Sequence, residues 1–155
     1  MRIWIWLVSF VLTSTLAHAE IKFPKEKIKL AGKTINVEVA RTNAQLSQGL
    51  MYRTHMGEND GMIFVFPDVA TRSFWMKNTF LPLSIGFFDD EKILVDIQDM
   101  APVKSEMETM PPSYVSAKPA RYALEMNQGW FKKNGVKVGA KFEGLGEKKN
   151  SGKAP

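Results

Sequence analysis

The sequence of 155 residues contains no cysteine. This absence excludes disulfide bonds, a thiol nucleophile, a lipid-modified N-terminal cysteine and a metal site built on thiolates. The folded state must therefore be stabilised by the packing of apolar side chains.

Histidine is scarce as well, because the chain has two and His18 lies in a segment that we expect to be removed. His55 then remains alone, so neither a two-histidine metal site nor a cysteine–histidine pair can be built. The sequence around it, residues 53–57, lacks the glycine pattern of a nucleophile elbow. We interpret His55 as an exposed histidine of a loop.

Long apolar runs are missing apart from one at the start of the chain. Arg2 gives a positive start, residues 3–16 are mainly apolar, and Ala17-His18-Ala19 has the small-x-small pattern that signal peptidase recognises. The run is shorter than the roughly 20 residues that span a bilayer. We predict that residues 1–19 are a cleaved secretory signal peptide and that the product is soluble and periplasmic, with no membrane span after signal removal.

Removal of 19 residues from 155 leaves 136, which suits one domain. We predict a single β domain over residues 20–143 and a polar tail, residues 144–155, that is expected to be disordered. The formal net charge of +5 falls by one to +4 without Arg2, which is compatible with weak attraction to anionic lipid or cell-wall polymer. Because the lysines are spread along the chain and the protein is exported, we expect no nucleic-acid partner.

Apolar residues of the mature chain recur mainly at every second position, as in half-buried strands. Thr42 and the helix formers after it predict a short helix over residues 44–52, and residues 128–133 predict a helical turn. Pro67 is expected to end a buried strand, and four prolines between positions 101 and 119 predict a long surface loop. The predicted strands span residues 27–30, 34–39, 62–66, 73–78, 83–88, 93–98, 122–126 and 136–142.

Short strands with little helix predict a mainly β fold. A sheet with one apolar face buries that face against another sheet or against itself. The long crossover helices that a parallel sheet needs are missing. We therefore expect a compact antiparallel sandwich or a jelly-roll-like barrel with one or two short helices.

Methionine is abundant, with nine in the sequence and eight once the first residue leaves. Thioether sulfurs are soft ligands that suit Cu(I), and Met100, Met107 and Met110 lie in or beside the proline-rich segment. A methionine-based Cu(I) site formed by these three residues is one alternative. Met62 and Met126 occupy predicted strand positions, where methionine is ordinary core material. Packing is therefore the favoured interpretation, and we expect no metal and no cofactor.

The densest mixture of aromatic and polar side chains lies at residues 74–79. On a strand, Trp75 and Lys77 point to one face and Asn78 to the other. An outward Trp75 flanked by Lys77 and by Arg53 would suit a sugar ring or an anionic group. An inward Trp75 is a core residue, which is the favoured interpretation because large aromatic side chains are mostly buried.

Two charges interrupt an otherwise apolar strand at Arg121 and Glu125. They share a strand face but lie too far apart for direct contact, so each needs a cross-strand partner. A structural ion pair is the simpler explanation, and a place in the wall of a pocket is the alternative. A buried acid such as Glu125 would also suit acid–base chemistry, provided that a second carboxyl converges on the same cleft.

Several blocks occur in a fixed order along the chain: GLMYR at 49–53, GMIFVF at 61–66, FWMKNT at 74–79, Pro82-Leu83, ARYALE at 120–125, Gly129 and GVKVG at 135–139. Together they resemble the bacterial and archaeal family called domain of unknown function 192, over residues 46–142. The resemblance implies a compact, mainly β domain of sandwich or jelly-roll type that is often exported, with no assigned activity. Many relatives carry aspartate at the position of Ser84, and some carry cysteine near Pro111, so the resemblance transfers no catalytic carboxylate or thiol at those positions.

Our leading hypothesis is a non-catalytic binding or accessory domain of the cell envelope, whose partner is a small molecule, a cell-wall polysaccharide or an envelope protein. A cell-wall hydrolase that uses buried carboxylates and the methionine-based Cu(I) protein are the alternatives. The sequence does not identify a catalytic residue. The candidate ligand-binding residues are Arg53, Trp75, Lys77, Asn78, Arg121 and Glu125.

Overall fold

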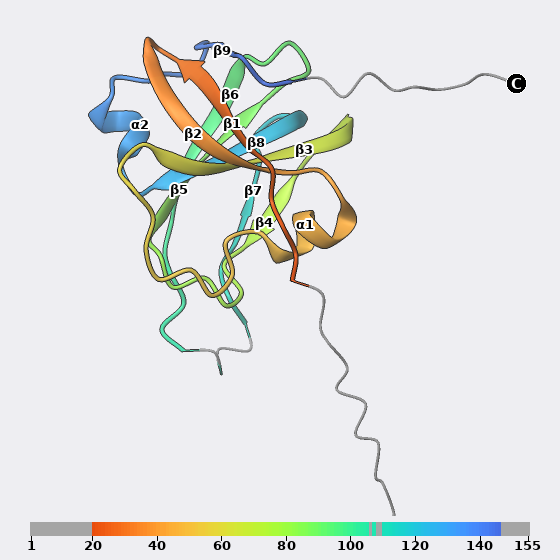
Figure 1. Ribbon diagram of the computed structural model, residues 1–155, viewed down its shortest axis with the longest axis vertical. Coiled ribbons are helices and arrows are strands. Elements are labelled where there is room, and N and C mark those ends of the chain that lie inside the picture. Colours follow the sequence, from red (N-terminus) through yellow and green to blue (C-terminus); the bar gives the residue numbers. More distant parts are fainter. Residues whose placement is uncertain (1–19, 106, 108–109, 147–155) are drawn as a thin grey trace, which may run out of the picture.

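A computed structural model describes residues 20–105, 107 and 110–146, and Figure 1 shows the arrangement of their helices and strands. The predicted signal peptide and most of the predicted tail lie outside the described residues. Within the described part, no helix is long and apolar enough to cross a membrane. The elements are β1 Lys25–Leu30, β2 Lys33–Ala40, α1 Asn43–Gln48, β3 Asp60–Ala70, β4 Ser73–Trp75, β5 Leu83–Phe88, β6 Leu94–Met100, β7 Ser113–Val115, β8 Ala120–Asn127, α2 Trp130–Lys133 and β9 Phe142–Glu143.

Seven strands form one curled sheet in the order β6-β5-β8-β3-β2-β1-β9. Its two edges meet, because the Leu94 backbone N–H donates to the Ala140 carbonyl at 2.8 Å and the Phe142 N–H donates to the Lys92 carbonyl at 3.1 Å. An isolated bridge between Ile93 and Lys141 lies between these bonds. The sheet therefore closes on itself as a barrel, which confirms the prediction of a compact, mainly β fold.

Two apolar layers cover the two faces of this sheet. The barrel core fills the inside and includes Ile35, Leu124 and Phe142 together with Phe131 of α2. The outer core lies on the opposite face, where Met62, Phe64, Ile85 and Phe87 are buried. Phe74 of β4 and Tyr114 of β7 pack against the outer core, so the small β4–β7 sheet covers that face. In Figure 1, β4 and β7 lie beside each other in the lower half of the fold.

The β2–β3 pair departs from the expected antiparallel arrangement. These strands run parallel, with Glu38 opposite Met62. A parallel pair needs a crossover, and here the short helix α1 and the loop 49–59 make it. Because no long helix is needed, the sequence pattern does not reveal this pair.

The expectation that Pro67 ends its strand is wrong. Strand β3 continues to Ala70, with a register shift against β8 between Val65 and Ala70. A proline has no N–H to donate, and a bulge is one of the places in a sheet where this loss is tolerated.

The loop predicted at 101–119 contains a strand, because β7 pairs with β4 through Phe74 and Tyr114. Strand β4 is correspondingly shorter than predicted. The closing strand predicted at 136–142 is reduced to β9, and Val138 is 59% exposed. Alternating valines there do not form a ladder because the chain turns at Gly139, which has a φ of +94°.

Ordered structure continues beyond the predicted domain boundary at 143. Leu145 is buried in the barrel core, and the Gly146 N–H donates to the Glu26 carboxylate at 2.7 Å. The first residues assigned to the polar tail are therefore part of the domain.

Candidate functional site

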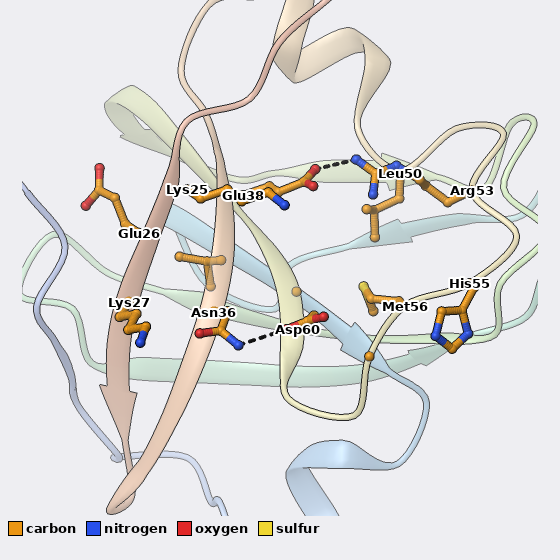
Figure 2. A pocket seen from close by; sticks show the side chains of 13 residues that line it. Lys25, Glu26, Lys27, Asn36, Glu38, Leu50, Arg53, His55, Met56 and Asp60 are labelled. Carbon is orange, nitrogen blue, oxygen red and sulfur yellow. Dashed lines mark hydrogen bonds and ion pairs between the residues drawn. The ribbon is translucent and has the colours of Figure 1, made fainter.

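A cavity of about 570 Å³ lies over β1, β2 and the start of β3, and the loop 49–57 forms its rim. We call it the strand–loop cavity. Figure 2 shows that side chains from the strands and from the loop face one another across it. Its wall combines charged and polar groups with the apolar residues Val37, Leu50 and Met56. The residues that matter below are Lys25, Lys27, Asn36, Glu38, Leu50, Arg53, His55, Met56 and Asp60.

Strand alternation explains why polar groups of β2 face this cavity. Ile35 and Val37 point into the barrel core, so Asn36 and Glu38 point to the opposite face. There Glu38 forms an ion pair with Arg53. The Asn36 amide donates to the Asp60 carboxylate at 2.9 Å. Both acids are therefore held in fixed positions before any ligand binds.

A tight turn places Asp60. Its backbone N–H donates to the Gly57 carbonyl at 3.1 Å, and a side chain at Gly57 would collide with the Asp60 carboxylate. A larger residue at position 57 would therefore displace the Asp60 carboxylate from its place in the cavity wall.

The loop that carries Arg53 is locked to the segment that follows β4. The Tyr52 N–H donates to the Asn78 carbonyl at 2.8 Å, and the Asn78 amide donates to the Tyr52 hydroxyl at 2.6 Å. Both residues have positive φ, +63° and +52°, a backbone region that is costly for residues with a Cβ. Two of the predicted site residues, Arg53 and Asn78, are thus brought to one loop junction. Of these, only Arg53 lines the strand–loop cavity.

The favoured core interpretation of Trp75 is wrong, because its residue is 55% exposed. Strand β4 belongs to the two-stranded sheet, whose inner face is occupied by Phe74, so the next side chain points to solvent. The Lys77 ammonium lies 5.1 Å from the centre of the Trp75 ring, at cation–π distance. Neither side chain belongs to the wall of the strand–loop cavity.

Glu125 is buried, with 6% of the residue exposed. It lies on β8 opposite Met62 of β3 and Ile85 of β5. Burial in this apolar setting raises the pKa of the Glu125 carboxyl to about 8. Among the described residues, no hydrogen bond or ion pair engages its carboxyl. The expected cross-strand ion partner is therefore not one of the described residues.

The register places Glu125 in one row with Glu38, because Met62 lies opposite both of them on neighbouring strands. The two acids share the outer face of the sheet. Glu125 does not line the strand–loop cavity.

Arg121 lies at the other end of β8 and lines a different cavity. Its Nε is buried and has no hydrogen-bond partner. The structure therefore separates Arg121 from Glu125 and from Arg53, so the six predicted residues do not form a single site.

The three methionines proposed for Cu(I) occupy unlike environments. Met100 is fully buried in the outer core, whereas Met107 and Met110 are 85% and 87% exposed. In the part of the chain that the structure describes, no group of three or more histidine, cysteine, aspartate or glutamate side chains is placed to hold a metal ion.

Ser84 has a structural role in this fold. Its hydroxyl bonds to the Asp99 carboxylate and accepts a hydrogen bond of 2.8 Å from the Gly129 N–H. It ties the start of α2 to the β5–β6 pair.

Sequence reasoning missed Asn36, Glu38 and Asp60. Alternation along β2 predicts that the first two point away from the core. The parallel β2–β3 register that brings Asp60 beside Asn36 has no sequence signal, so the pairing could not be predicted.

The comparisons with known proteins agree with this fold. A family model, DUF192, described as Uncharacterized ACR, matches residues 26–144. A crystal structure of a "putative transcription regulator" from Sinorhizobium meliloti 1021 is 36% identical, with a TM-score of 0.72 over 81% of this chain and 97% of that one. A protein of unknown function from Novosphingobium aromaticivorans DSM 12444 is 31% identical, with a TM-score of 0.66 over 78% of this chain and 84% of that one. No curated protein matches.

Proposed function

The chain belongs to the DUF192 family, and we propose that it is an exported, non-catalytic binding domain of the cell envelope. Its ligand is a small, hydroxyl-rich molecule, such as one sugar unit of a cell-wall polysaccharide. The strand–loop cavity holds that ligand.

The observation that carries this proposal is the composition of the cavity wall. Glu38 and Asp60 supply acceptors, and Arg53 and Asn36 supply donors, in pairs that are already bonded to each other. Sugar hydroxyls both donate and accept, so they bind well to such mixed pairs. Leu50 and Met56 add apolar surface for the ring.

The balance of charge in the wall favours a neutral ligand. The cavity wall contains three cations, Lys25, Lys27 and Arg53, and three acids, Glu26, Glu38 and Asp60. A strongly anionic ligand would be repelled by the acids, and a strongly cationic one by the lysines and the arginine.

Replacement of Arg53 tests the proposal. We expect the mature protein to bind oligomers of N-acetylglucosamine in isothermal titration calorimetry, and Arg53→Ala to weaken that binding by about tenfold or more. Arg121→Ala is the matched control, since it removes an arginine from another cavity. Equal binding by wild type and Arg53→Ala, with both folded, would contradict the proposed site.

Export is tested separately by N-terminal sequencing of the protein from the periplasmic fraction. We expect the mature chain to begin at Glu20. An intact Met1 in the cytoplasmic fraction would contradict the envelope assignment without affecting the binding result.

A hydrolase is the alternative that the row Glu38–Met62–Glu125 raises. It is disfavoured because Glu125 does not line the strand–loop cavity, so its carboxyl does not converge with that of Glu38 on this cleft. A carboxyl with a raised pKa can act as a general acid while a second, ionised carboxylate acts as a base. We expect no hydrolysis of peptidoglycan by the wild type. Turnover that Glu125→Gln abolishes, while sugar binding persists, would favour the enzyme.

A further inference from the structure

A second cavity, of about 370 Å³, lies at one end of the barrel. We call it the barrel-end cavity. It is formed where β2, β5 and β9 end and β8 begins, and it shares no wall residue with the strand–loop cavity.

Three cations line the barrel-end cavity: Arg41 after β2, Lys92 in the turn before β6 and Arg121 at the start of β8. No carboxylate belongs to its wall among the described residues. Segments far apart in the sequence thus bring positive charge to one place, whereas the strand–loop cavity mixes both signs.

Two of these cations lie over aromatic rings at the end of the barrel core. The Lys92 ammonium is 5.9 Å from the centre of the Phe142 ring, and the Arg121 guanidinium is 5.9 Å from the centre of the Tyr122 ring. The two rings are 5.3 Å apart. The two cations therefore lie beside the same pair of packed rings.

Arg41 is partly compensated. Its guanidinium donates to the Gly146 carbonyl at 2.6 Å and lies 3.7 Å from the Glu26 carboxylate. Among the described residues the wall of this cavity still consists of cationic and uncharged side chains, which suits an anionic group such as a phosphate.

Besides the three cations of the cavity wall, an unpaired donor of Arg121 points to a ligand. Its Nε is buried without a hydrogen-bond partner, although buried polar groups in folded proteins are nearly always bonded. A guanidinium presents its donors in a planar fork that fits two oxygens of an oxyanion. A bound phosphate at this place would satisfy the donor that the protein leaves unpaired.

We propose that the barrel-end cavity binds the phosphate group of a small phosphate-bearing molecule. Arg121 is the principal contact, and Arg41 and Lys92 add charge. Phe66, Val65 and Leu145 in the same wall accommodate an organic part attached to the phosphate.

Calorimetric titration of the mature protein with glycerol phosphate, inorganic phosphate and glycerol tests the proposal. We expect saturable binding of the phosphates and none of glycerol. Tighter binding of glycerol phosphate assigns the site to phosphate esters, whereas equal binding assigns it to free phosphate. In ¹⁵N NMR, the Arg121 Nε resonance should shift as phosphate is added.

Arg121→Gln should weaken phosphate binding by about tenfold or more, and Arg53→Gln, in the other cavity, should leave it unchanged. If Arg121→Gln does not fold, Arg41→Gln serves the same comparison. The proposal is overturned if neither phosphate binds at about 10 mM, or if a folded Arg121→Gln or Arg41→Gln binds as tightly as the wild type.

Discussion

Glu125 places a carboxyl on the outer face of the sheet, opposite the buried Met62 and Ile85. Its neighbours across the strands, Met62 and Ile85, offer no hydrogen bond from their side chains. Burial raises the pKa of this carboxyl from 4.5 to about 8. The folded protein therefore holds the proton more tightly than the unfolded chain, in which the ordinary pKa applies.

The raised pKa of Glu125 determines the direction in which the free energy of unfolding changes with pH. Below about pH 4.5 the carboxyl of Glu125 is protonated in both the folded and the unfolded protein, and the stabilisation that comes from its raised pKa is fully present. This stabilisation is lost as the pH rises toward about 8. The expected loss for the wild type is on the order of a few kcal/mol. Glu125→Gln stays neutral, so its stability should vary less over the same range. Urea unfolding between about pH 5 and pH 9 measures both curves.

The matched control for this prediction is Glu143→Gln, because Glu143 is exposed and its replacement should keep the wild-type slope. A wild-type free energy of unfolding that does not fall with pH would contradict a raised pKa at Glu125.

Single residues also show where sequence reasoning succeeds. The interruption of an apolar strand by Glu125 indicates a carboxyl in an unusual setting, and the structure buries it. Arg53 lines the strand–loop cavity, and its role as a ligand-binding residue stays a prediction. Trp75 was assigned to the core because its size favours burial. The size of a side chain does not show which face of a strand it occupies. The partner strand β7 lies in a proline-rich segment that predicts a loop, so the sequence does not identify the outward face of β4.

At the scale of elements, the crossover from β2 to β3 builds the strand–loop cavity. The helix α1 begins with a capping box in which Thr42 and Gln45 each bond to the backbone of the other. The loop after α1 then returns the chain to the start of β3. The cap could be read from the sequence, but the parallel register that the loop produces could not.

The Tyr52–Asn78 contact is expected to stabilise that loop. Asn78→Ala removes the amide bond to Tyr52 and places a less tolerant residue at a φ of +52°, so we expect a loss of about 1–3 kcal/mol. Asn78→Gly loses the same bond but relieves the backbone. It should therefore be less destabilising than the alanine variant. Chemical denaturation of the three proteins gives the comparison, and a glycine variant less stable than the alanine variant would refute the role of backbone conformation.

At the scale of the whole molecule, closure of the barrel depends on the segment between α2 and the tail. Alternating apolar residues at 136–142 suggested one more regular strand. Instead, the chain makes backbone bonds to residues 92–94 over a short stretch, and only some of the alternating residues are buried. Period-two patterning identifies apolar positions, but it does not separate those that face a closed interior from those that face solvent.

Substitutions at Phe142 and Val138 measure how much a buried and an exposed apolar residue of this segment each contribute to stability. The Phe142 ring is fully buried and makes edge-to-face contacts with Phe88 and Tyr122, whose ring centres lie 5.0 and 5.3 Å away. Phe142→Ala should therefore destabilise the fold by about 3–5 kcal/mol, the usual cost of a large cavity in a core. Val138 is 59% exposed, so Val138→Ala should change stability by less than about 0.5 kcal/mol. Equal losses in urea unfolding would mean that residues 136–142 pack as a regular strand, and a negligible loss for Phe142→Ala would mean that the barrel does not depend on this closure.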